Sequence, residues 1–157
     1  MTTIIASTEA IAADMKVSGC HVGRVVKLFG LNGSVWGTAG SASWSEMFIE
    51  WLRAGQKKAA RDLQYKQMKD GEADNFQALQ IRPDKKIILW ETPWIPIELE
   101  VPAFGIGSGS AYALGAMSAG ASLEQAIKIA SQWDEATGSE VQILTLDQVK
   151  RTKRKRG

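Results

Sequence analysis

The sequence is poor in the residues on which most catalytic pairs and metal sites depend. It contains one cysteine, Cys20, and one histidine, His21. A single cysteine cannot form an internal disulfide bond, and these two residues are too small a set to hold a metal ion. Neighbouring side chains on a strand point to opposite faces, so we do not expect Cys20 and His21 to act as a catalytic pair. The sequence therefore predicts no metal and no cofactor, and it favours a reducing cytoplasm.

Long apolar runs are also missing. No segment approaches the ~18 apolar residues that a membrane-spanning helix requires. The N-terminal segment carries Glu9 and Asp14 but no basic residue, so it does not have the pattern of a signal or transit peptide. We therefore expect a soluble, cytoplasmic protein.

Familiar nucleotide-binding and hydrolase motifs are absent as well. No G-x-S-x-G elbow surrounds a serine, and a Ser-His-Asp triad would depend on His21 alone. The glycine-rich stretch at 105–109 lacks the lysine and the spacing of a phosphate-binding loop, and its simplest interpretation is a turn before a helix. These absences leave the N-terminus as the place to look for a nucleophile.

Positive charge is concentrated at one end of the chain. The net charge is +2, and six of the 19 basic residues lie within Lys150–Arg156. The rest of the chain has 13 basic and 17 acidic side chains, so it offers no general basic surface for nucleic acid. Nucleic-acid binding is therefore expected only through this tail.

Length and composition predict one globular domain. The chain has 157 residues, of which 45% are hydrophobic and 23% are charged, an ordinary globular composition. At this length, folding buries roughly 68–70% of the unfolded surface without disulfides or metals. We expect a single domain over residues 1–148, followed by a basic, flexible tail over residues 149–157.

The beginning of the chain has the pattern of antiparallel strands. Apolar and β-branched residues at 2–6 and 10–13 are separated by polar positions, which predicts two short strands and a tight turn. Apolar stretches at 22–31 and 34–39 flank Asn32-Gly33, a strong hairpin signal because both residues tolerate positive φ.

Helical spacing begins at Ser43. Ser43 and Glu46 form a capping box, and apolar residues from Trp44 to Trp51 recur on one helical face, which we expect to be core rather than a ring contact. The charged stretch to Lys69 either continues this helix or forms a loop.

Strands and helices follow in separate runs. Strands are expected at 76–81 and 86–90, helices at 110–119 and after Ser122, and a last strand at 141–146. The apolar face of the second helix carries Ala126, Ile129, Ala130 and Trp133. Segregated runs of this kind favour the α+β class, with two stacked sheets and helices outside them.

Thr2 is the candidate nucleophile. Removal of Met1 by the usual aminopeptidase would leave Thr2 with both a hydroxyl and a free α-amine. Because an α-amine has a pKa of about 7.7–8.0, it can act as a base near neutral pH without a histidine. The plainer interpretation is a strand residue, since threonine favours strands.

Six segments, taken together and in order, resemble the signatures of proteasome β-subunits. They are TTIIA at 2–6, AAD at 12–14, VVKLF at 25–29, GTAG at 37–40, GSG at 107–109 and WDEATG at 133–138. The likeness spans residues 2 to about 146 and is greatest to small bacterial and phage-type relatives of HslV, a ring protease that partners an ATPase. It implies an N-terminal-nucleophile (Ntn) hydrolase fold, a four-layer αββα sandwich of two antiparallel sheets between helices.

The resemblance also implies catalytic roles. Thr2 is the nucleophile, Lys27 lowers the pKa of its amine and favours the alkoxide, and Asp14 holds that lysine in an ion pair. Gly40 supplies the backbone N–H of an oxyanion hole. Without the resemblance, Asp14 would be interpreted as a turn residue, Lys27 as a solvated strand lysine and Gly40 as an ordinary turn.

Three further residues have supporting roles in this resemblance. Ser108 matches the serine that contacts the terminal amine and helps to relay its proton, and the alternative is a helix cap. Asp134 and Thr137 match a supporting pair near the N-terminus, with Thr137 where serine is more common. Their alternative interpretation is a helix end that closes at Gly138.

The implied reaction is amide hydrolysis through an acyl-enzyme ester on Thr2. Four small or medium-sized residues would line the pocket for the side chain before the cleaved bond and give a modest hydrophobic preference: Val17, Val25, Thr38 and Ala42. The implied partners are a peptide or unfolded protein substrate, further copies of the chain in a homo-oligomeric ring, and an ATPase unfoldase.

Two other functions stay open. We expect no propeptide, so activity would depend on removal of Met1, and a retained Met1 would leave a catalytically silent structural or assembly subunit that binds partners through its tail. A small-molecule amidase of the same broad superfamily is the third possibility. The turn at Ser7–Ala10 lacks the glycine usual in the family, and the basic tail is not a family element, so both features depart from the resemblance.

Overall fold

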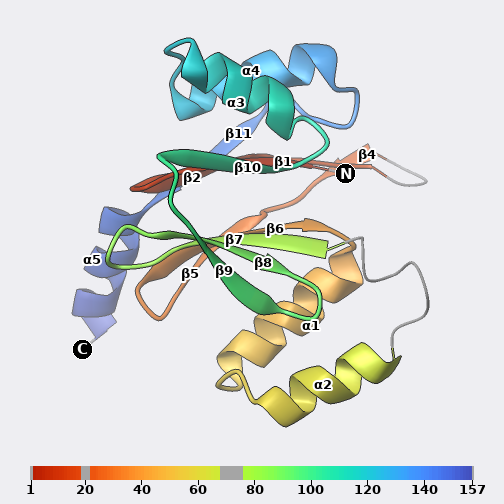
Figure 1. Ribbon diagram of the computed structural model, residues 1–157. Helices are drawn as coiled ribbons and strands as arrows, with labels where there is room; N and C mark the ends of the chain where they lie inside the picture. Colours follow the sequence, from red (N-terminus) through yellow and green to blue (C-terminus); the bar gives the residue numbers. More distant parts are fainter. Residues whose placement is uncertain (1, 19–21, 68–75, 157) are drawn as a thin grey trace.

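The computed structural model describes residues 2–18, 22–67 and 76–156. Two β-sheets lie face to face in the middle of the molecule, and a pair of helices lies on the outer side of each sheet (Figure 1). This is the four-layer αββα sandwich of an α+β protein that the resemblance implied, and the prediction is confirmed.

The first sheet contains the start of the chain. Its strands, in order across the sheet, are β10 (Ala103–Gly107), β1 (Thr3–Ser7), β2 (Ala10–Asp14) and β11 (Val141–Thr145). All pairs are antiparallel, and Ile4 lies opposite both Ala13 and Ile106. Strands β1 and β2 are buried on both faces, which explains their continuous apolar sequence.

The second sheet contains five antiparallel strands. In order they are β5 (Leu28–Leu31), β6 (Ser34–Gly40), β7 (Phe76–Ile81), β8 (Ile87–Glu91) and β9 (Ile95–Leu99). The predicted Asn32-Gly33 hairpin is confirmed, with φ angles of 53° and 78° at the two turn residues. The prediction of one continuous strand over 22–31 is wrong. Val22–Arg24 (β4) pairs with Lys16–Ser18 (β3) in a separate hairpin, and only Leu28–Leu31 joins the second sheet.

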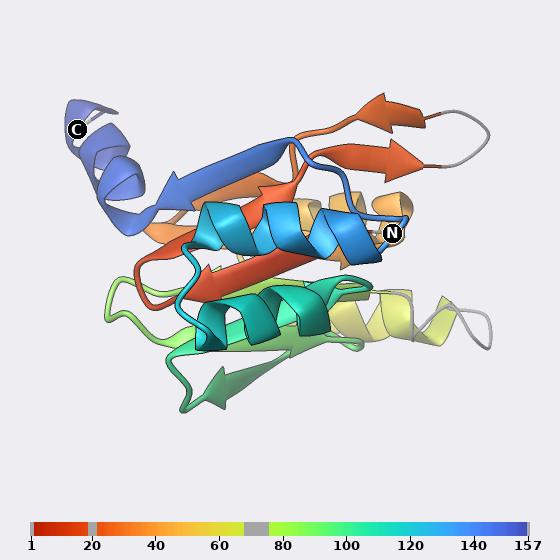
Figure 2. The same cartoon turned by 90° about the horizontal axis from the view of Figure 1, so that it is seen from above.

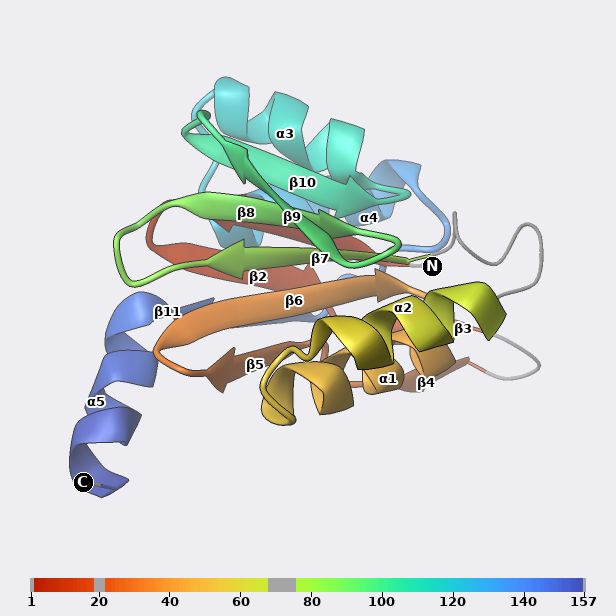
Figure 3. The same ribbon diagram turned by 60° about the horizontal axis from the view of Figure 1, so that its bottom comes forward.

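The helices cover the two outer faces. Those on the first sheet are α3 (Ser110–Ser118) and α4 (Leu123–Trp133), which lie side by side when the molecule is seen from above (Figure 2). Those below the second sheet are α1 (Ala42–Arg53) and α2 (Lys58–Gln67) (Figure 3). The charged stretch after α1 thus forms a second helix.

The apolar core between the two sheets differs in composition from the core between the second sheet and α1. Between the sheets, Ile4, Val35 and Leu79 are fully buried in an aliphatic core. Between the second sheet and α1, the core is aromatic and contains Phe48 and Trp51. The expectation that the apolar face of this helix is core is therefore confirmed for these two residues.

Several local predictions are wrong. Helix α1 begins two residues early because the hydroxyl of Ser41, not Ser43, accepts the hydrogen bond from the N–H of Trp44. The stretch that begins at Gly105 is not simply a turn, since Gly105–Gly107 completes strand β10 beside β1. The buried face of α4 differs from the predicted one. Ile127 is buried, whereas Trp133, predicted to lie on the apolar face, is 69% exposed.

The C-terminal segment is helical. Residues Leu146–Arg156 form helix α5, and Leu146 and Val149 are buried against the aliphatic core, while the flexibility expected of residues 149–157 stays a prediction. The expected domain end at residue 148 falls inside this helix. Helix α5 projects from one end of the molecule, on the opposite side from the start of the chain (Figure 2).

One earlier prediction concerns residues that the structure does not describe. Cys20 and His21 lie in the gap at 19–21, so their proposed separation stays a prediction. Within the described ranges, no helix has the length and hydropathy needed to cross a bilayer.

Candidate active site

Thr2 lies at the edge of the sandwich, immediately before β1. It is 5% exposed, and the peptide group that joins it to Thr3 is held by two hydrogen bonds. The N–H of Ser108 donates to the carbonyl oxygen of Thr2 at 3.0 Å, and the N–H of Thr3 donates to Asp14 Oδ1 at 2.8 Å. The first residues of the chain are therefore fixed between β10 and the end of β2.

Asp14 is the centre of the polar cluster around Thr2. It is the last residue of β2 and is fully buried. Its Oδ1 accepts hydrogen bonds from the hydroxyl of Thr2 at 2.8 Å and from Lys27 Nζ at 2.9 Å, in addition to the N–H of Thr3. Its Oδ2 accepts from the amides of Lys16 and Gly138, both at 3.0 Å. Five donors thus compensate the burial of one carboxylate.

Lys27 forms a buried ion pair with Asp14. Its side chain is 8% exposed, and Nζ also donates to the carbonyl oxygen of Lys16 at 2.6 Å. Burial lowers the pKa of the Lys27 ammonium below its ordinary value, and the hydrogen bond and charge of Asp14 only partly oppose this. The Thr2 hydroxyl and the Lys27 ammonium therefore donate to the same carboxylate oxygen. The lowered pKa makes the Lys27 ammonium easier to deprotonate than an ammonium in water.

A second polar cluster lies on the other side of β1. The hydroxyl of Ser108 donates to Asp134 Oδ2 at 2.7 Å, and the hydroxyl of Thr137 donates to the same oxygen. Burial raises the pKa of Asp134, but the hydrogen bonds from Thr137 and Ser108 outweigh it, so the pKa lies below its ordinary value. Asp134 therefore stays ionised near neutral pH, close to the backbone of Thr2.

Thr3 connects this second cluster to the start of the chain, and sequence analysis missed it. It is fully buried, its Oγ1 lies within hydrogen-bonding distance of Thr137 Oγ1, and it accepts a hydrogen bond from the N–H of Gly109 at 3.0 Å. The alternation of side chains along β1 could have revealed it, since Thr3 must face away from Thr2, toward the helices.

Two glycines allow the backbones to approach closely here. A Cβ atom on Gly107 would lie 1.8 Å from the carbonyl oxygen of Thr2, and one on Gly109 would lie 2.3 Å from Thr3 Oγ1. Gly107 also has a φ of 89°, which favours glycine. The glycine-rich stretch is thus required by its packing against the first two threonines.

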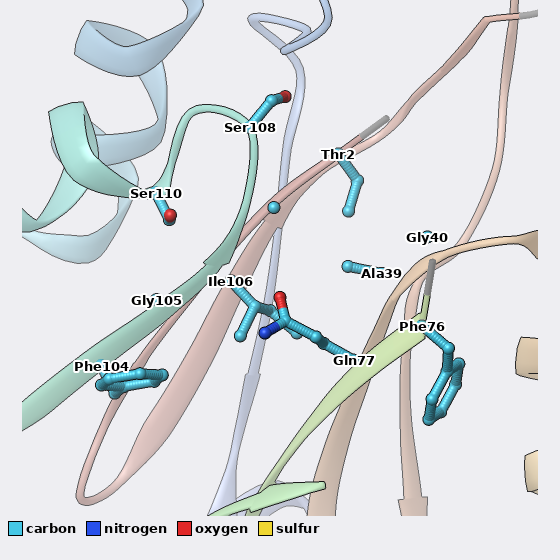
Figure 4. A pocket seen from close by; sticks show the side chains of 11 residues that line it. Thr2, Ala39, Gly40, Phe76, Gln77, Phe104, Gly105, Ile106, Ser108 and Ser110 are labelled. Atoms are coloured by element: carbon cyan, nitrogen blue, oxygen red, sulfur yellow. The ribbon is translucent and has the colours of Figure 1, made fainter. Parts of the chain in front are cut away.

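A cleft of about 340 Å³ opens beside Thr2. Gly40, at the end of β6, lines it together with Thr2 and Ser108 (Figure 4). Gly40 has a φ of 104°, so a side chain at this position would strain the backbone. The predicted nucleophile, the predicted oxyanion donor and the predicted proton relay therefore border one cleft.

The four predicted pocket residues lie elsewhere. Val17 and Val25 are 42% and 41% exposed, Ala42 is exposed and Thr38 is buried. None of them lines the cleft beside Thr2. Their role in recognising the substrate stays a prediction.

Comparison with known proteins gives a likeness in structure. No protein-family model matches the chain, and no curated protein matches its sequence. Among solved structures, Thiobacillus denitrificans BPH has a TM-score of 0.69 at 20% identity, over 92% of this chain and 96% of that one. A complex of the same protein with epoxomicin gives a TM-score of 0.67 at 19% identity, over 92% and 96% of the two chains.

Eukaryotic HslV from Trypanosoma brucei is similar to the same degree. Its TM-score is 0.67 at 19% identity, and the match covers 91% of this chain and 98% of that chain. Such identities establish a common architecture and not a common activity. The chain therefore has the fold of BPH and HslV, a four-layer α+β sandwich.

Proposed function

We propose that this chain is a threonine-type peptidase of the HslV and proteasome kind, with Thr2 as its nucleophile once Met1 has been removed. The observation that carries the proposal is the meeting of the Thr2 hydroxyl and the Lys27 ammonium at Asp14 Oδ1. A buried ion pair is seldom the most stable way to fill an interior, so its position beside a hydroxyl at a cleft favours a catalytic role.

The proposed acylation uses groups of Thr2 itself. The α-amine accepts the proton of the hydroxyl as Oγ1 attacks the carbonyl carbon of the peptide bond. The C–N bond then breaks, the leaving amine takes up that proton, and the acyl group remains on Thr2 as an ester. The positive charge of Lys27 favours deprotonation of the hydroxyl, and Asp14 holds both groups in position.

Water completes the proposed cycle. The α-amine, now free, removes a proton from a water molecule that attacks the ester, and the Thr2 oxygen leaves with a proton as the carboxylic acid product forms. Asp134 and Ser108 would orient the amine and carry protons to and from it, an assignment supported by their mutual hydrogen bond beside Thr2. The N–H of Gly40 would stabilise the developing oxyanion, for which such a donor contributes ~2.7–4 kcal/mol.

We also propose that the chain assembles into a homo-oligomeric ring that takes peptide or unfolded protein, with an ATPase as a partner. The fold likeness to HslV supports the ring. The outer helix layer supports self-association, because it exposes Tyr112, Ile129 and Trp133 to 47%, 37% and 69%. Light scattering would show a species several times the 17.1 kDa of one chain.

Two measurements on the purified protein test the catalytic proposal. Intact mass should correspond to a chain that begins at Thr2, and peptide hydrolysis should disappear in Thr2→Ala. Thr152→Ala changes an exposed threonine on α5 and is the matched control, with activity equal to that of the wild type.

Other outcomes would contradict the catalytic proposal. A chain that retains Met1 throughout and cleaves no peptide would favour the silent structural subunit instead. Turnover of small amides without any turnover of peptides would favour the amidase.

A further inference from the structure

The cleft beside Thr2 extends well beyond the proposed catalytic residues. It passes between edge strand β10 and the first residues of β7, so it opens between the two sheets. In Figure 4, Phe104 lies at the end of the cleft away from Thr2, and the side chain of Gln77 reaches from β7 toward β10. The far part of the cleft is therefore built by side chains to which no role has been assigned.

The lining of this cleft is uncharged. Its residues are Thr2, Ala39, Gly40, Phe76, Gln77, Phe104, Gly105, Ile106, Gly107, Ser108 and Ser110. The amide of Gln77 donates from Nε2 to Glu91 Oε1 at 2.9 Å, which fixes this side chain from the neighbouring strand. A charged ligand group would find no opposite side-chain charge among these lining residues.

The sheet order places the cleft on a defined side of the nucleophile. In the first sheet, β10 and β2 flank β1 on opposite sides, and in the second sheet, β7 and β5 flank β6 on opposite sides. The cleft belongs to the β10 and β7 side. Val17 and Val25, predicted to receive the side chain before the cleaved bond, follow β2 and precede β5 on the other side.

We infer that the far part of this cleft, formed by Phe104 and Gln77, binds a large uncharged side chain, preferably aromatic, from the substrate residue that follows the cleaved bond. This inference rests on the proposed peptidase function, because it takes Thr2 as the point of attack. A peptide that crosses Thr2 has its two neighbouring side chains on opposite sides of the nucleophile, and the predicted pocket occupies one of those sides.

Size and chemistry both select this class of side chain. The whole cleft, from Thr2 to Phe104, measures about 340 Å³, within the range of pockets that accommodate small ligands, so it has room for a large side chain beside the reacting peptide bond. An aromatic ring packed on Phe104 would gain about 0.5–1.5 kcal/mol beyond its buried area. An acidic or basic side chain would lose its hydration without a counter-charge in the lining.

Sequencing the products of a peptide mixture by mass spectrometry tests the inference. The wild-type enzyme should cut before Phe or Tyr about 10- to 200-fold faster than before Asp, Glu, Lys or Arg. Phe104→Ala should reduce this preference by about tenfold, and Gln77→Glu should increase cleavage before Lys and Arg. The matched controls are Tyr65→Ala on α2 and Gln132→Glu on α4, exposed residues outside the cleft, which should leave the preference unchanged.

The outcomes separate the two proposals. Cleavage that depends on Thr2 but shows no preference after the cleaved bond, or a preference that neither cleft variant changes, would overturn the subsite and leave the peptidase intact. If Phe104→Ala and Gln77→Glu changed only the preference for the residue before the cleaved bond, that result would also overturn the proposed subsite. If no cleavage depends on Thr2, both proposals fail together.

Discussion

Two buried regions of this molecule are filled in opposite ways. Between the second sheet and α1, Phe48 is fully buried and its ring centroid lies 5.0 Å from that of Phe76 and 5.6 Å from that of Trp90. At the end of β2, an inner strand of the first sheet, Asp14 is equally buried, but its neighbours are hydroxyl, ammonium and amide groups. The first region is an apolar core and the second is a polar network.

The comparison shows where stability explains the residues and where it does not. Aromatic packing is favourable in itself, so the Phe48 region needs no further reason. Replacing a buried ion pair with apolar residues of similar volume is often neutral or stabilising, so Asp14 and Lys27 need a reason beyond folding. We take that reason to be catalysis at Thr2.

The largest expected effect comes from Asp14→Ala. It leaves the Lys27 ammonium buried without a counter-charge, so the free energy of unfolding should fall by about 3–5 kcal/mol, and peptide hydrolysis should be lost. Chemical denaturation and a peptidase assay measure the two effects.

The double variant Asp14→Ala with Lys27→Met is the control for this prediction. It removes both charges, so it should regain much of the stability while remaining inactive. A double variant as unstable as the single one would show that the polar network, like the aromatic core, contributes chiefly to stability.

A change of similar size in the other region should affect stability alone. Phe48→Ala removes a fully buried ring and should lower the free energy of unfolding by about 3–5 kcal/mol. At a temperature where the variant stays folded, its kcat should match that of the wild type. A loss of kcat in folded protein would mean that the two regions are coupled, contrary to our comparison.

Thr3→Val should have an intermediate effect. It keeps the shape of the side chain but removes the acceptor for the N–H of Gly109 and the partner of Thr137, which costs about 1–3 kcal/mol in stability. Because Thr3 holds the chain next to Thr2, kcat should fall while KM changes little. Thr3→Ser keeps the hydroxyl and should have a kcat close to that of the wild type. Equal kcat values in the wild type, Thr3→Val and Thr3→Ser would show that Thr3 does not position Thr2.

The smallest expected effect is the contribution of Asp134 to stability at low pH. Its folded pKa lies below the unfolded value of about 3.9, so the native state releases this proton more readily than the unfolded state does. The stabilisation is complete above the unfolded pKa and is lost as the pH falls through the lower folded pKa. The unfolding free energies of wild type and Asp134→Asn should therefore converge in acid, and curves that stay parallel down to pH 2 would contradict the shift.

Local sequence patterns predicted much of the fold. Asn32-Gly33 forms the predicted hairpin, and the helix predicted after Ser122 begins there with Ser122 as its N-cap, because both signals depend on neighbouring residues only. Strand β10 was missed since Gly105 and Gly107 are unfavourable in a strand, and their place there follows from pairing with Ile5 and Thr3 of β1, about 100 residues away in sequence.

The candidate site was less accessible to sequence reasoning. Thr2 was named from the absence of other nucleophiles and the chemistry of a free N-terminal threonine. Asp14 and Lys27 were named through the resemblance and not from their local pattern, in which Asp14 is simply the end of a strand. Thr3 and Phe104 were not named, since their importance comes from what the tertiary fold places beside them. Long-range placement of this kind cannot be derived from periodicity.

Mapping an epoxyketone probe on the protein tests the central claim most directly. Such a probe needs a nucleophilic hydroxyl and a free amine on the same residue, so it reports both properties of an unblocked Thr2. We predict a single adduct on the N-terminal peptide beginning at Thr2, formed by the wild type and by Thr152→Ala but not by Lys27→Met. An unmodified protein that keeps Met1, or an adduct on any other residue, would contradict the account.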